Sequence, residues 1–163
     1  LVRSLTADLN VDAKQTELLR QLQTTITGDG ADLVRGEALF TKHCANCHQL
    51  RGKGLVVGPQ LDGAASRSIQ RLLEDIITPD RNVDHAFRTT SLLLDDGRVV
   101  AGLITSESDT EVVVVEPTGK PITLNPATIE QRREAGRSLM PGNMGEILAA
   151  EELRDLIQFV KGR

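Results

Sequence analysis

The clearest chemical signal in this sequence is the run Cys44-Ala45-Asn46-Cys47-His48. Two thiols separated by two residues and followed at once by a histidine are the signature of covalent haem attachment. The thiols add to the two vinyl groups of haem, so both must lie on the same side of one turn, as residues i and i+3 of a helix do. The motif predicts one covalently bound haem, held by Cys44 and Cys47, with His48 as an axial ligand of the iron.

Three other interpretations of the motif stay open. A thioredoxin-like redox pair needs a βαβ unit with the cysteines at the start of a helix. Half of a zinc site would need completion by His43, His48 or His85, and the third alternative is a structural pair of buried thiols. Because the chain has only two cysteines, a disulfide scaffold and a four-cysteine zinc site are excluded.

A second axial ligand is expected from elsewhere in the chain. Both methionines lie in the loop 138–144, which is rich in proline and glycine and a poor place for a side chain that only fills a core gap. Pro141 would stiffen the backbone that presents Met140, so Met140 is the predicted ligand. Met144, His85 and an open sixth position are the alternatives.

Two further features concern the surroundings of a haem. A backbone carbonyl in the segment 58–61 could accept the second ring N–H of His48, although an ordinary Gly-Pro turn is the simpler interpretation. Basic side chains could pair with the haem propionates, with Arg67 or Arg81 preferred. The candidates are Arg51, Lys53, Arg67 and Arg81.

The elements that position these residues follow from periodicity. Apolar spacing predicts helices, the first of them in an N-terminal arm, and the Val-, Ile- and Thr-rich segments predict a meander with a hairpin at Asp96-Gly97. The fold is expected to be mainly α, with a small antiparallel β-meander inserted between the third helix and the methionine loop. The expected arm is 1–30 and the expected domain 31–163, with helices at 31–44, 66–77 and 149–161 and strands at 88–95, 98–106, 111–116 and 121–125, so that the insertion covers about 88–125.

Composition narrows the classes of function. The net charge is −4 and no basic stripe occurs, which argues against nucleic-acid binding. No apolar run reaches the roughly 18 residues of a transmembrane helix. With three Phe and no Tyr or Trp, the core lacks its usual aromatic mass, which a haem would supply. Because residue 1 is Leu, we interpret the chain as a mature form or as part of a longer protein.

The motifs together resemble class I cytochromes c. The resemblance rests on Arg35–Phe40, Cys44–His48, Gly58–Leu61 and Ser138–Pro141. It implies that Gly36 and Phe40 of the first domain helix pack against the last helix. It also implies that the Pro59 carbonyl binds His48, that Leu61 supports the haem pocket, and that Met140 is the distal ligand.

A closer resemblance is to the haem-binding domain family of the planctomycete and verrucomicrobial type, which carries an extra β-region before the methionine. It covers roughly residues 31–161 and rests on segments 77–80, 96–104, 138–141 and 152–157. The resemblance implies an extracytoplasmic, periplasmic location. It further implies a monohaem electron-transfer module, not itself an enzyme, that serves a fused or separate dehydrogenase and a further redox partner.

Two other functions remain in competition with electron transfer. A haem-based ligand sensor or a peroxidase-like site would require an open or weakly held sixth position. A docking module would instead use the β-meander as a protein-binding face, and this role is compatible with electron transfer.

Overall fold

The computed structural model describes the backbone of residues 2–162 and the side chains of residues 13–162. In this part of the chain three α-helices precede an antiparallel sheet, and the last helix returns to pack against the second one. The helices are α1 (Val2–Ile26), α2 (Leu33–His43), α3 (Ile69–Ile77), α4 (Met144–Ile147) and α5 (Ala150–Lys161), with short 3₁₀ turns η1 (Asp62–Ser66), η2 (His85–Phe87) and η3 (Pro126–Thr128). The strands are β1 (Arg88–Leu94), β2 (Val99–Glu107), β3 (Val112–Val115), β4 (Pro121–Leu124) and β5 (Ile129–Ser138).

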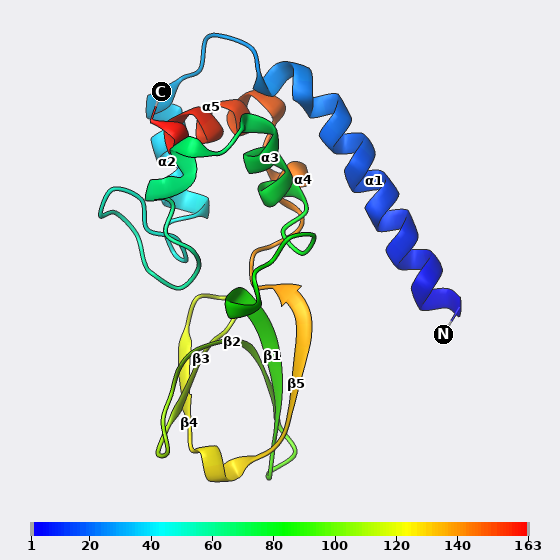
Figure 1. Cartoon of the computed structure of the whole chain (residues 1–163), viewed down its shortest axis with the longest axis vertical. Helices are drawn as coiled ribbons and strands as arrows, with labels where there is room; N and C mark the ends of the chain where they lie inside the picture. The colour runs from blue at the N-terminus through cyan, green and yellow to red at the C-terminus, as the bar shows by residue number, and fades with distance from the viewer. Residues whose placement is uncertain (1, 163) are drawn as a thin grey trace. The chain divides into compact units, whose positions relative to one another are not determined.

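The described residues form two compact units. The helical unit contains the chain up to Cys44, the segment Leu61–Thr78 and the chain from Gly142 onward, and therefore all the α-helices named above. The sheet unit contains Ala45–Gln60 and Pro79–Pro141, and therefore all the strands. Figure 1 shows both units, coloured along the chain.

The helical unit is built on the close approach of α2 and α5 at Gly36. A Cβ atom at Gly36 would lie 2.3 Å from the Asp155 carbonyl oxygen and 2.7 Å from Phe159 Cβ, so a larger residue cannot occupy this position without a shift. One turn later Phe40 is buried, and its ring centre lies 5.9 Å from that of Phe159. Gly36 and Phe40 therefore contact the last helix, as predicted.

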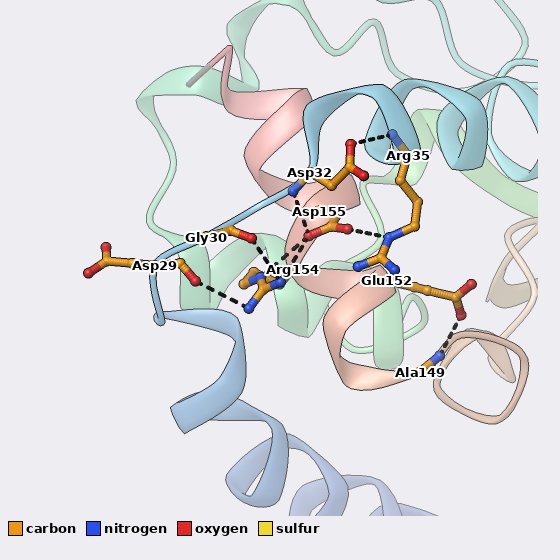
Figure 2. A network of polar contacts seen from close by, with 8 residues as sticks. All are labelled: Asp29, Gly30, Asp32, Arg35, Ala149, Glu152, Arg154 and Asp155. Atoms are coloured by element: carbon orange, nitrogen blue, oxygen red, sulfur yellow. Dashed lines mark hydrogen bonds and ion pairs between the residues drawn. The ribbon is translucent and has the colours of Figure 1, made fainter.

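A fully buried carboxylate joins the same two helices (Figure 2). Asp155 Oδ1 accepts the backbone N–H of Asp32 at 3.1 Å, and its Oδ2 accepts Arg35 Nε at 2.5 Å. Next to it, Arg154 donates to two backbone carbonyls in the connection between α1 and α2. Since a buried charge is tolerated only when it is paired and hydrogen-bonded, this arrangement fixes the start of α2 against α5.

Helix α1 packs within the helical unit. Leu22 and Ile26 are buried, and α1 contacts both α3 and α5. A Cβ atom at Gly145 would lie 2.6 Å from Leu18 Cδ2, which shows how closely α1 approaches α4. The structure thus groups α1 with the other helices, and the boundary at residue 30 stays a prediction.

The sheet unit is an antiparallel sheet in the order β4-β3-β2-β1-β5. The predicted hairpin at Asp96-Gly97 joins β1 and β2, with Gly97 at φ +82° and its N–H bonded to the Leu94 carbonyl. The strands are curved (Figure 1), and they share one apolar cluster. Its buried members are Leu92, Leu94, Val100, Val112, Val114 and Leu124.

The prediction of a mainly α fold with a four-stranded meander is corrected by this sheet. The structure has helices plus a five-stranded antiparallel sheet that extends to Ser138, and β5 was not predicted. Strand β5 pairs only with β1, and residues 130–137 are exposed. A strand without a buried face shows no apolar alternation, which is why its sequence carried no strand signal. Among the described helices, even α1 does not combine the length and hydropathy needed to cross a bilayer.

Candidate functional site

The Cys44–His48 motif begins where α2 ends. Asp32 caps the start of α2, and Cys44 is its C-cap, with its N–H donated to the Phe40 carbonyl at 2.8 Å. The chain then leaves the helix, and residues 44–47 form a turn. Packing of Gly36 and Phe40 on α5 thus holds the helix that ends at the first cysteine.

The loop that follows folds back onto the motif through backbone hydrogen bonds. The Leu55 N–H donates to the Ala45 carbonyl at 2.9 Å, and the N–H groups of Val57 and Gly58 both donate to the Cys47 carbonyl, at 3.0 and 2.7 Å. Gly54, at φ +96°, allows the fold-back, because a Cβ atom there would lie 2.2 Å from the His48 carbonyl oxygen. The loop therefore holds the backbone on both sides of His48.

His48 is oriented by Pro59. Its Nδ1 lies 2.8 Å from the Pro59 carbonyl oxygen, and since a carbonyl can only accept, Nδ1 carries the proton and donates. The lone pair is then on Nε2, the nitrogen available to a metal. Burial lowers the pKa of His48, against an opposing effect of the Pro59 hydrogen bond, so the neutral, ligating form is favoured. Gly58 makes room for the ring, because a Cβ atom there would lie 2.8 Å from His48 Cε1.

The two cysteines are partly exposed thiols that are not joined in a disulfide. Burial raises the pKa of the Cys47 thiol, and Cys44 lies at the C-terminal end of a helix. A thioredoxin-like pair needs the opposite environment, since a helix N-terminus lowers the pKa of its reactive thiol. Within residues 13–162, no group of three or more His, Cys, Asp or Glu side chains could hold a metal ion.

The two methionines have different environments. Met144 is 5% exposed and belongs to the core of the helical unit at the start of α4. Met140 follows β5 in the sheet unit and is half-buried, with its N–H donated to Ser138 Oγ at 3.1 Å. Met144 therefore has the core-filling role usual for methionine, and Met140 does not.

The remaining candidates are dispersed. His85 is exposed in η2, and its Nε2 lies 2.9 Å from Glu134 Oε2. Arg67 is held by Asp75 at 2.6 Å. Arg81, Arg51 and Lys53 are exposed, and Leu61 is half-buried at the start of η1.

Arg88 lies beside the methionine segment and was not among the residues singled out from the sequence. Its Nε is buried and has no hydrogen-bond partner among the described residues, while its Nη1 lies 3.1 Å from Glu134 Oε1. Arg88 pairs in register with Ser138, two residues before Met140. No sequence signal marks it, because it is one of several arginines and its neighbour Ser138 lies in the strand that was not predicted.

The residues present fit a covalently bound haem. Two partly exposed thiols three residues apart stand beside an imidazole whose Nε2 is unprotonated, which is the set of groups that covalent haem attachment requires. The close approach of Gly58 to the ring and the Pro59 hydrogen bond hold His48 in one orientation, as second-shell partners of a ligating histidine do.

A comparison with protein families agrees with this geometry. The family model described as Cytochrome c matches residues 33–99. The match starts at α2, ends at the first residue of β2 and includes Cys44, Cys47, His48 and Pro59, but not Met140. It supports a c-type cytochrome, that is, a haem-binding electron-transfer module with covalently attached haem.

Proposed function

We propose that this chain is a monohaem c-type cytochrome domain that transfers single electrons, with His48 and Met140 as the axial ligands. The observation that carries the proposal is the bond of His48 Nδ1 to the Pro59 carbonyl, which leaves Nε2 unprotonated and able to bind a metal in a histidine adjacent to two thiols. A structural histidine would have no need of the two thiols beside it.

Each side chain has a defined task. The thiols of Cys44 and Cys47 would hold the haem covalently, each through a thioether bond to one vinyl group. When bound, the haem would supply a one-electron Fe(III)/Fe(II) couple. His48 would hold the iron through Nε2, and the neutral thioether of Met140 would favour the reduced state and so raise the potential.

The setting of the domain is also a proposal. The resemblance to the haem-binding domain of the planctomycete and verrucomicrobial type supports an extracytoplasmic, periplasmic site of action. There the domain would accept electrons from a fused or separate dehydrogenase and pass them to another redox protein. The net charge of −4 would give weak electrostatic steering toward a basic partner.

Visible spectra of the purified holoprotein, oxidised and reduced, test the proposal. With His48 and Met140 bound, we expect sharp reduced bands and a weak oxidised band at ~695 nm that Met140→Ala abolishes. Met144→Ala is the matched control, since it removes a buried core methionine and should lower stability but keep the band. The mass of the intact protein should show one retained haem.

Other results would assign a different function. Prompt CO binding by the reduced parent protein, with no band from Met140, would indicate an open sixth position and hence a ligand sensor or peroxidase-like site. Loss of the band in Met144→Ala but not in Met140→Ala would assign the ligand to Met144.

A further inference from the structure

The chain enters and leaves the sheet unit at two points that are hydrogen-bonded to each other. Asp80 follows Pro79 at the entry, and Ser138 ends β5 at the exit. Asp80 Oδ1 accepts the Ser138 backbone N–H at 2.7 Å, although 58 residues separate the two. The hydrogen bond between a carboxylate and an N–H is charge-assisted and among the stronger kinds in proteins.

The same exit segment continues directly to Met140. Ser138 Oγ accepts the Met140 N–H at 3.1 Å, so the backbone of Met140 is tied to Ser138, whose own N–H is tied to Asp80. Two successive hydrogen bonds thus connect the Asp80 carboxylate to the backbone of the methionine.

Strand β1 holds the exit segment from its other side. Arg88 pairs with Ser138, and Thr89 Oγ1 donates to the Arg137 carbonyl at 3.1 Å. Between Arg88 and Thr90 the register shifts, because their partners Ser138 and Glu134 lie four residues apart in β5, which indicates a bulge in β5 just before this segment. Bulges often occur beside functional sites, where they redirect the chain.

We propose that Asp80 is a positioning residue for Met140, and that one function of the sheet is to present this methionine as an axial ligand. The proposal rests on the assignment of Met140 as the distal ligand. Asp80 lowers the number of conformations open to the Ser138–Pro141 segment, so less conformational entropy is lost when the sulfur binds iron. Without Asp80 the haem stays attached through Cys44 and Cys47, but the bond to Met140 opens more often.

Competition with imidazole measures this opening. Imidazole binds the oxidised iron only when Met140 has left it, so its apparent affinity rises as Met140 is held less well. We expect Asp80→Ala to raise the imidazole affinity of the holoprotein about tenfold, as a charge-assisted bond of moderate strength would, and Asp80→Asn to have a smaller effect because an amide oxygen still accepts. Amide hydrogen exchange at Ser138 and Met140 should accelerate in both variants.

Asp84→Ala is the matched control. Asp84 lies four residues further along the same connection, is exposed, and accepts the Ala86 N–H at 3.0 Å, so its loss removes one negative charge and one similar bond without affecting Ser138. Its imidazole affinity should stay within twofold of the parent. Met140→Ala gives the upper limit of imidazole affinity.

Two results would overturn the proposal in distinguishable ways. If Met140→Ala raises the affinity and Asp80→Ala does not, Met140 is the ligand but Asp80 does not position it. If neither variant changes the affinity, Met140 is not the ligand, and the proposed axial ligation falls together with the role of Asp80. An equal effect of Asp84→Ala would also overturn the proposal, because the change would then come from charge alone.

Discussion

Each of the two units is stabilised internally by its own kind of contact, and the two kinds differ. The helical unit depends on a few contacts between segments far apart in the chain, such as Gly36 against α5 and the hydrogen bond from the Asp32 N–H to Asp155, which spans 123 residues. In the sheet unit most neighbouring strands are also consecutive in the chain, and they share one apolar cluster. A long-range contact has no substitute when it is lost, whereas a strand ladder distributes its stability over many similar pairs.

The two units also contain different residues of the candidate site. The helical unit contains α2 and Cys44 at its end, and the sheet unit contains His48 and Met140. We expect the helical unit to tolerate few substitutions at its helix crossing. The sheet should tolerate changes on its exposed edge strand β5 but not in its core.

The largest effect is expected from Gly36→Val. The new side chain would meet the Asp155 carbonyl and Phe159, so we expect destabilisation of about 3 kcal/mol or more, even though a glycine in a helix is normally unfavourable. Urea unfolding followed by circular dichroism measures it. Gly63→Ala is the control, because a Cβ atom at Gly63 would meet nothing within 4 Å. Equal midpoints for the two variants would show that α2 and α5 do not pack in this way.

In the sheet unit, Leu92→Ala should lower the free energy of unfolding by about 3 kcal/mol. Leu92 is fully buried in the apolar cluster, so the substitution leaves a cavity. Hydrogen exchange of the β1 and β2 amides reports the loss. Val99→Ala on β2 serves as the reference, because Val99 is 65% exposed and should change stability little. Protection that is unchanged in Leu92→Ala would contradict the assigned core.

Asp155→Asn should lower the free energy of unfolding by about 2 kcal/mol. The reason is that one buried charge-assisted bond, to Arg35 or to the start of α2, is weakened. Thermal unfolding of the variant can be compared with that of Glu151→Gln, an exposed change of the same kind in the same helix. If the two variants unfold at the same temperature, the buried carboxylate contributes little to the contact of α2 with α5.

The smallest effect concerns Glu17 on α1. Hydrogen bonds from Arg20, then from Gln21, lower the pKa of this carboxyl from 4.5 to about 2. Because the pKa of Glu17 is lower in the folded state, the stabilisation that its ionised carboxylate gives is fully present above pH 4.5 and is lost as the pH falls toward 2.

Carbon-detected NMR titration of Glu17 measures the pKa, and Arg20→Gln should return it toward 4.5. The pair is exposed, so global stability should change little. A Glu17 that titrates at 4.5 in the parent protein would refute the ion pair.

Local features of the fold were predictable because the covalent chain sets their spacing. The helices ending near His43, Ile77 and Lys161 follow from apolar periodicity, and the hairpin follows from Asp96-Gly97. Four of the strands carry β-branched residues with a buried face and were predicted within a few residues. Strand β5 was missed because residues 130–137 are exposed and polar, so only its pairing with β1 makes it a strand.

The sequence by itself predicted the chemistry of the candidate site, because the spacing of Cys44, Cys47 and His48 is local and is the signature of covalent haem attachment. Tertiary structure decided how those residues are held, including the contact with Pro59 that the family resemblance implied. The bond of His48 to Pro59, the burial of Met144 and the bond from Ser138 to Asp80 each join segments that only folding brings together. Spacing along a chain specifies which atoms can react, whereas packing between distant segments specifies where those atoms are held.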